Sequence, residues 1–153
     1  MARTTIHELL AAARARLERL EPEAAAQAAA VGDAILVDIR SETQRAQEGT
    51  IAGAVWHPRN VLEWRVDPAC SHADPVLSRD LGARLVLVCH EGYQSSLAAA
   101  TLQDLGFARA TDLAGGFRAW RAAGLPIVPG SPLSGVPGPL EDVPRERSGA
   151  YGG

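Results

Sequence analysis

The sequence contains no lysine, and all fifteen of its basic side chains are arginine. Without a lysine amine, the chain cannot form a Schiff base with a carbonyl substrate or build a phosphate-binding loop of the GK[ST] type. There are two cysteines, Cys70 and Cys89, which are too few for a disulfide scaffold. What remains to be asked is whether either thiol does chemistry.

Long apolar runs and an excess of positive charge are missing as well. No stretch approaches the length of a membrane-spanning helix, and eighteen acidic residues outnumber the arginines, for a formal net charge of -3. The composition therefore predicts no nucleic-acid partner and no membrane partner. Near the N-terminus, arginines interrupt the apolar stretch before it can act as a secretory signal. We expect a cytoplasmic protein whose thiols are kept reduced.

The length of 153 residues fits one domain of ordinary size, and residues 1–32 read as a helical segment. Apolar residues recur at helical spacing over 5–20, and Thr5 fits the first position of a capping box. A second, alanine-rich helix is predicted to begin at Pro22 and to end near Ala30. We expect this segment to pack on the domain that follows.

From residue 33 to 128, short apolar runs alternate with helical stretches. The expected strands cover 35–38, 54–56, 85–88 and 109–112, and the expected helices cover 42–48, 95–105 and 117–122. This alternation predicts an α/β domain with a mostly parallel central sheet. Over 129–153 proline and glycine replace any periodicity, which predicts a tail with little structure of its own.

Cys89 directly follows the clearest strand, and Ser95 begins the next helix. In parallel sheets, ligands bind at the carboxyl ends of the strands, where the intervening loop 90–94 must lie. A tight loop at a helix N-terminus aims backbone N–H groups inward, and Gly92 permits the positive φ that such a loop needs. A cysteine held there has its thiolate favoured. The alternative is that Cys89 is only the last buried residue of a strand.

Four motifs in this part of the chain resemble the rhodanese-like sulfurtransferase family. They are Leu36-Val-Asp-Ile-Arg40, Gly49-Thr-Ile-Ala-Gly-Ala54, Cys89-His-Glu-Gly-Tyr-Gln-Ser95, and Asp112-Leu-Ala-Gly-Gly-Phe-Arg-Ala-Trp120 with Ala123-Gly-Leu-Pro126. Together they span 33–128 in the right order and spacing. The resemblance implies a three-layer fold with a five-stranded, mostly parallel sheet and helices on both faces. It also implies that Cys89 accepts a sulfane sulfur without a metal or an organic cofactor.

The loop departs from the family at one position. Many members carry arginine five residues after the cysteine, where this chain has Gln94. The loop therefore lacks a charge beside the sulfur, and we expect anionic donors such as thiosulfate to bind less well. Cysteine phosphatases require arginine six residues after the cysteine, and Ser95 cannot replace that guanidinium. Phosphoryl transfer is therefore not expected.

Two arginines are candidates to supply the missing charge. Arg59 and Arg65 flank a segment that follows the second strand, and either can lie near Cys89 or on a solvated helix face. Arg65 is slightly favoured over Arg59. Trp64, between them, can line the site but is expected in the core, as is Trp120.

Other polar residues have weaker claims. Asp38 and Arg40, at the end of the first strand, are expected to form a local structural pair, with Glu48 as a further partner. Cys70 lies in a loop-like stretch and is expected to be incidental, although it can also be a resolving thiol. His90 is expected to point to solvent. No zinc-ligand spacing is present.

These observations favour a sulfurtransferase that works by double displacement through a persulfide on Cys89. The expected partners are a small sulfur donor, thiosulfate or a persulfide, and a thiol or cyanide acceptor, which can itself be a protein. The predicted site comprises Cys89 with His90, Glu91, Gly92, Tyr93, Gln94, Ser95, Arg65 and Arg59. The alternatives are a protein-binding or sulfur-carrier module with little turnover, and a redox switch between Cys70 and Cys89.

Overall fold

The computed structural model describes residues 2–130, so the tail predicted over 129–153 lies outside the described residues from position 131 onward. Four parallel strands form one sheet in the spatial order β2–β1–β3–β4. Their bounds are Ile35–Asp38 for β1, Val55–Trp56 for β2, Leu85–Val88 for β3 and Thr111–Asp112 for β4. β1 and β3 pair along their whole length, with Val37 beside Leu87. The predicted parallel α/β architecture is confirmed.

The sheet has four strands among the described residues, where the resemblance implied five. At the β4 edge, Leu20 adds a single parallel bridge to Leu113. The N–H of Leu20 donates to the Asp112 carbonyl at 3.1 Å, and the N–H of Ala114 donates to the Leu20 carbonyl at 2.8 Å. The N-terminal segment is therefore attached directly to the edge of the sheet.

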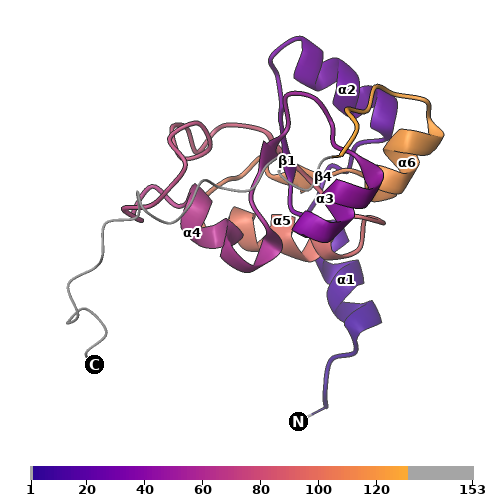
Figure 1. Ribbon diagram of the computed structural model, residues 1–153. Helices are drawn as coiled ribbons and strands as arrows, with labels where there is room; N and C mark the ends of the chain where they lie inside the picture. The colour runs from indigo at the N-terminus through magenta and orange to yellow at the C-terminus, as the bar shows by residue number, and fades with distance from the viewer. Residues whose placement is uncertain (1, 131–153) are drawn as a thin grey trace.

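Helices cover both faces of the sheet (Figure 1). One face packs against α2, Pro22–Ala30, and α6, Gly116–Ala122, whereas the other packs against α4, Leu62–Val66, and α5, Gln94–Asp104. Successive side chains of a strand point to opposite faces, so Leu87 enters the core beneath α5 and Val88 enters the core beneath α6. Burial on both faces explains why β3 is apolar throughout.

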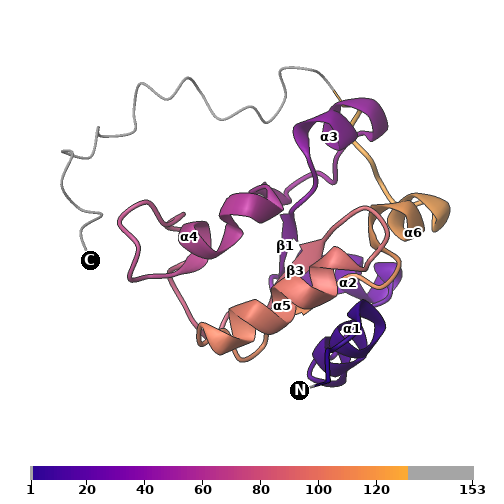
Figure 2. The same cartoon turned by 90° about the horizontal axis from the view of Figure 1, so that it is seen from below.

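Three further elements complete the described chain: α1 spans Ile6–Ala15, α3 spans Glu42–Glu48, and the 3₁₀ turn η1 spans Arg59–Val61. α1 lies against α5 (Figure 2). The capping box at Thr5 is confirmed, but α1 ends five residues earlier than predicted because the chain turns away to bring Leu20 to β4. The other predicted elements keep their ends within two residues. Among residues 2–130, no helix has the length and apolar character needed to cross a membrane.

The two predicted core tryptophans behave differently. Trp120 is buried, as predicted, whereas Trp64 is 62% exposed and the prediction that it lies in the core is wrong. Leu62 and Val66, two positions on either side of Trp64 in α4, are fully buried. Because an α-helix has 3.6 residues per turn, two side chains four positions apart lie on the same side of it. The side chain midway between them points to the opposite side, here toward solvent.

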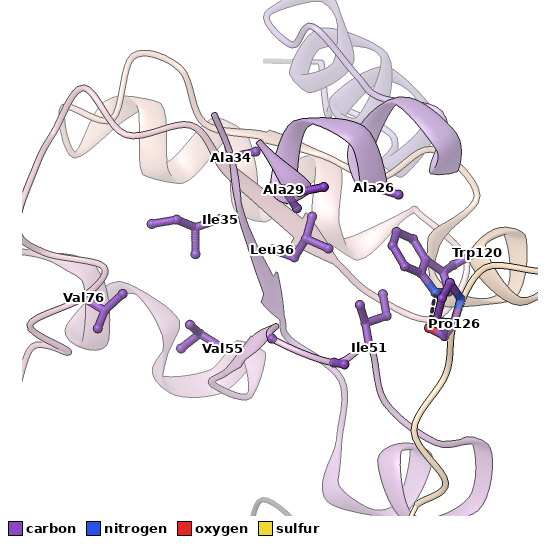
Figure 3. A pocket seen from close by; sticks show the side chains of 13 residues that line it. Ala26, Ala29, Ala34, Ile35, Leu36, Ile51, Val55, Val76, Trp120 and Pro126 are labelled. Atoms are coloured by element: carbon purple, nitrogen blue, oxygen red, sulfur yellow. Dashed lines mark hydrogen bonds between the residues drawn. The ribbon is translucent and has the colours of Figure 1, made fainter. Parts of the chain in front are cut away.

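A separate apolar hollow of about 560 Å³ opens beside α2 and the start of β1 (Figure 3). Alanines of α2 and the side chains of Leu36 and Ile51 line it, and Trp120 forms one end, where its indole N–H donates to the Pro126 carbonyl at 3.0 Å. Among the described residues, none of its lining comes from the loop that carries Cys89. It is therefore distinct from the candidate site.

A buried ion cluster lies at the end of β1. Arg40 donates from Nε and Nη2 to the two carboxylate oxygens of Asp38, at 3.0 and 2.8 Å, and Arg45 donates to the same carboxylate at 3.2 Å. Arg40 also donates to the Gly49 carbonyl and lies over the ring of Phe117. The predicted structural pair is confirmed, with Arg45 as the third member of the cluster.

This cluster gives a stability prediction. Asp38→Asn leaves two buried guanidinium groups without their carboxylate, and we expect the free energy of unfolding in urea to fall by about 3–5 kcal/mol. The matched control is Asp33→Asn, because Asp33 pairs with Arg84 and Arg109 at the surface. Its loss is expected to stay below about 1 kcal/mol. Equal losses in the two variants would contradict the assignment.

Candidate active site

Cys89 lies at the carboxyl end of β3, at the centre of the sheet, and the loop 90–93 leads from it into α5. Only 4% of the residue is exposed, so its thiol is a buried group at the edge of the α5 core. The loop lies where parallel sheets place their ligands, as the order of strand, loop and helix predicts. The loop leads directly into the N-terminal end of α5, a helix of eleven residues. The dipole of that helix favours negative charge at this end.

Two backbone amides of this loop are aimed at the sulfur. The N–H of Gly92 donates to Sγ of Cys89 at 3.1 Å, and the N–H of Ser95 donates to it at 3.4 Å. The hydroxyl of Ser95 lies 3.2 Å from the same sulfur, with the thiol as donor. The arrangement can hold a thiolate or a persulfide by main-chain donors alone.

The shape of the loop depends on contacts between glycines. Gly92 has φ +85°, and a Cβ on it would lie 2.7 Å from the backbone nitrogen of Gly115. A Cβ on Gly116 would lie 2.6 Å from the Cys89 carbonyl oxygen. This close approach lets the N–H of Phe117, in the first turn of α6, donate to the Cys89 carbonyl at 2.8 Å. Gly115, the N-cap of α6, and Gly116, its first residue, therefore support the loop through close backbone contacts.

A buried carboxylate that sequence reasoning did not single out lies behind Ser95. Asp112, at the end of β4, is fully buried, and its Oδ2 accepts hydrogen bonds from the hydroxyls of Ser95 and Ser96, each at 2.7 Å. Arg19 donates to both oxygens of that carboxylate, at 2.8 and 3.2 Å. Asp112 lies near Cys89 because the carboxyl ends of β3 and β4 are adjacent in the sheet.

Two arginines of the N-terminal segment also hold the loop. Arg14 and Arg19 both donate to the carbonyl of Gly92, at 2.7 and 3.0 Å. Arg14 further donates to the hydroxyl of Ser96 and lies 5.5 Å from the ring of Tyr93. No sequence signal links these arginines to a loop more than seventy residues away, and the prediction of the site missed them.

The charged side chains of the loop form pairs with neighbouring helices and do not point toward the sulfur of Cys89. His90 is half-buried, and its Nε2 lies 2.8 Å from Glu48, so the expectation that it points freely to solvent is wrong. The sequence predicts Glu48 beside Asp38, whereas the structure pairs it with His90 and Arg121. Glu91 is exposed and accepts from Arg118 at 2.6 Å. Neither pair brings a charge against Sγ.

An open cavity of about 550 Å³ lies beside the loop, and its lining places one of the two candidate arginines near Gln94. Arg59 and Gln94 both line it, together with Trp56. Arg65 instead donates to the carbonyl of His72, and it is not among the described residues that line the cavity. Arg59, which also pairs with Glu63, thus shares a cavity with Gln94, whereas Arg65 points toward another segment.

The second thiol lies elsewhere. Cys70 is partly buried in the loop after α4, and both cysteines are free thiols. Within the described part of the chain, no three histidine, cysteine, aspartate or glutamate side chains are grouped so that they could hold a metal ion.

Comparison with known proteins gives the same family as the motifs. The model of the rhodanese-like domain matches residues 21–123. A thiosulfate sulfurtransferase GlpE from Pseudomonas fluorescens is 38% identical over 104 residues, which cover 68% of this chain and 84% of the relative. A sulfurtransferase from Allochromatium vinosum is 34% identical over 96 residues, which cover 63% of this chain and 79% of the relative.

Solved structures agree in fold. A Rhodopseudomonas palustris protein of unknown function, described as a possible tyrosine phosphatase, superposes with a TM-score of 0.74 at 34% identity and covers 83% of this chain and 98% of its own. The human single-domain sulfurtransferase TSTD1 superposes with a TM-score of 0.59 at 28% identity and covers 68% and 95%.

The glycine contacts give a prediction about the loop. Gly92→Ala adds a methyl group against Gly115 at a positive φ, and we expect it to lower the free energy of unfolding and to slow alkylation of Cys89 by iodoacetamide at neutral pH several-fold. Gly53→Ala is the matched control, because Gly53 has φ +82° and nothing within 4 Å of the added carbon. It is expected to lose about 1 kcal/mol through φ alone and to leave alkylation unchanged. Slower alkylation in both variants would refute a specific role for the Gly92 contact.

Proposed function

The chain belongs to the rhodanese-like domain family, and on that premise we propose that it is a sulfurtransferase that carries sulfane sulfur as a persulfide on Cys89. The observation that carries the proposal is the pair of N–H groups, from Gly92 and Ser95, that point at Sγ. Main-chain donors at a helix N-terminus stabilise the anionic sulfur that both halves of such a reaction require. Relatives named as sulfurtransferases support the same class of reaction.

In the loading step, the Cys89 thiolate attacks the outer sulfur of the donor. With thiosulfate, a new S–S bond forms on Sγ, the S–S bond of the donor breaks, and sulfite leaves with the electron pair. The negative charge of the thiolate moves to the terminal sulfur of the persulfide. We propose that the amides of the loop 90–95 hold that terminal sulfur.

In the unloading step, an acceptor thiolate or cyanide attacks the terminal sulfur. The persulfide S–S bond breaks, and Sγ of Cys89 leaves as a thiolate, so charge is conserved and the enzyme returns to its starting form. The acceptor becomes a persulfide or thiocyanate. Since Cys89 must be a free thiol between turnovers, a reducing compartment such as the cytoplasm is part of the proposal.

Phosphatase chemistry has less support. The Rhodopseudomonas palustris structure is described as a possible tyrosine phosphatase, but clamping a transferred phosphoryl group requires a guanidinium fork at the end of the loop. This chain has Gln94 and Ser95 there. Ser95 is fully buried with its hydroxyl committed to Cys89 and Asp112, so it offers no substitute.

Gln94 and Arg59 bear on the choice of donor. Gln94 is exposed at the mouth of the loop and carries no charge. Because Arg59 lines the same cavity, we propose it, ahead of Arg65, as the side chain that meets an anionic donor. The absence of a charge at position 94 also keeps a second candidate open, a protein-binding or sulfur-carrier module with little turnover.

Sulfur loading tests the proposal directly. Incubation with thiosulfate or with glutathione persulfide is expected to add the mass of one sulfur atom to the peptide that contains Cys89, and cyanide is expected to remove it with release of thiocyanate. Intact-protein and peptide mass spectrometry measure both steps.

The controls for loading use the two cysteines. Cys89→Ser is expected to abolish the adduct, whereas Cys70→Ser is expected to retain it. Loading without multiple turnovers would favour the carrier module. Failure to load with either donor, in a folded protein, would refute the sulfurtransferase.

A charge introduced at position 94 tests donor selection. Gln94→Arg is expected to raise kcat/KM for thiosulfate about 10-fold, because a guanidinium forms a charge-assisted hydrogen bond with the anion. Gln94→Met, which is similar in length and uncharged, is expected to show no gain. Steady-state thiocyanate formation measures both. A similar gain in the two variants would show that charge at this position is not what limits thiosulfate use.

A further inference from the structure

We infer that Asp112 is a positioning residue that, through the hydroxyl of Ser95, keeps resting Cys89 in its thiol form, and that Arg19 tunes this effect. The biological role of this effect rests on the proposed function, whereas the effect itself can be measured without any sulfur transfer. The inference starts from a continuous set of hydrogen bonds: Arg19 to Asp112, Ser95 to Asp112, and Cys89 to Ser95. Cys89, Ser95 and Asp112 are all buried, so water does not substitute for the contacts among these three residues.

The hydroxyl of Ser95 has one proton to donate and two neighbours able to accept it. Oδ2 of Asp112 lies 2.7 Å away, and Sγ of Cys89 lies 3.2 Å away. Asp112 receives a two-point ion pair from Arg19, which requires a carboxylate, and a carboxylate only accepts. The shorter contact and the negative charge both direct the Ser95 proton toward Asp112.

In the thiol form, every donor and acceptor in this set is satisfied. The S–H group of Cys89 donates to Ser95, and Ser95 donates to Asp112. When the thiol proton leaves to water, two anions, the thiolate and the carboxylate, compete for the one proton of Ser95. Ser95 can turn to the sulfur, because Asp112 keeps its bonds from Ser96 and Arg19, but it does so at the expense of its own bond to Asp112.

The persulfide relieves this competition. Once the outer sulfur is attached, the negative charge lies on that sulfur and no longer on Sγ. Ser95 can then donate to Asp112 again, while the loop amides serve the charged sulfur. The bare thiolate is thus the one state of the cycle that the carboxylate disfavours. We infer that Asp112 makes resting Cys89 less open to oxidation and favours the sulfur-loaded form over the free thiolate.

The other charged groups around the loop are held in pairs. His90 contacts Glu48, on α3, and Glu91 contacts Arg118, on α6. Arg14, on α1, binds the Gly92 carbonyl and Ser96 rather than the carboxylate. Asp112 and Arg19 are therefore the charges that act on Cys89 through Ser95.

Two adjacent serines give a matched test. Ser95 and Ser96 are both fully buried and both donate to Oδ2 of Asp112 at 2.7 Å, but Ser95 is the one that contacts Sγ. The experiment measures the rate of Cys89 alkylation by iodoacetamide against pH, in a Cys70→Ser background. Ser95→Ala is expected to raise the midpoint of that profile by about one pH unit, because the thiolate loses a donor. Ser96→Ala removes a donor from Asp112 but none from Sγ, so it is expected to raise the midpoint by less, about half a pH unit.

Asp112→Asn is expected to move the midpoint in the opposite direction, down by about one pH unit. The amide removes the negative charge and can donate to Ser95, which frees the hydroxyl proton for the sulfur. If Ser95 and Asp112 had only structural roles, the two substitutions would not move the midpoint of the alkylation profile in opposite directions. An Asp112→Asn midpoint that rises or stays in place, in a protein with unchanged circular dichroism, would overturn the inference.

A second pair keeps the test decisive if Asp112→Asn does not fold. Arg19→Gln and Arg14→Gln each remove one guanidinium from the Gly92 carbonyl, but Arg19 alone of the two binds Asp112. Arg19→Gln is expected to raise the midpoint by about half a pH unit more than Arg14→Gln, because the unpaired carboxylate holds the Ser95 proton more strongly. Equal shifts would refute the inference. Alkylation needs no sulfur donor, so these outcomes are independent of whether the protein transfers sulfur.

Discussion

The hydrogen bonds from the backbone of Gly92 and Ser95 to the sulfur of Cys89 are the interaction on which the rest of the structure depends. Holding them requires a strand that ends just before Cys89, a helix that begins within five residues of it, and a turn with positive φ between them. β3 meets the first requirement by being buried on both faces, which leaves it no freedom to shift. Gly115 and Gly116, at the N-terminus of α6, support that turn by letting the N–H of Phe117 reach the carbonyl of Cys89.

Because main-chain donors hold the sulfur, the side chains around the loop are free to do other work. His90 and Glu91 are drawn into pairs with neighbouring helices, and Gln94 leaves the mouth of the loop without charge. Asp112 and Arg19 are the charged side chains that hydrogen bonds link to the sulfur through Ser95. In the function proposed above, a site built in this way separates two tasks: amides stabilise the transferred sulfur, and the buried carboxylate sets the resting state of the cysteine that carries it.

Some of this arrangement was predictable because it follows from local patterns. The unbroken apolar run of β3, the capping box at Thr5 and the glycine at position 92 each act on their own neighbours in the chain, and each was predicted correctly. The prediction for Trp64 is wrong because α4 is short. Five residues are too few for a periodic pattern that would indicate which side of the helix faces the core. The contact between His90 and Glu48 joins the loop after β3 to the end of α3, which no spacing in the sequence reveals.

The sequence by itself therefore determined the α/β alternation, the family, and the loop that presents Cys89, since these depend on periodicity, glycine and short-range motifs. The tertiary structure alone decided which distant side chains surround that loop. Arg14 and Arg19 reach it because Leu20 bridges to β4 and α1 lies against α5, and Asp112 reaches it because β4 lies beside β3. The physical reason is that burial gives a hydrogen bond its strength irrespective of separation along the chain, whereas a sequence pattern records only neighbours.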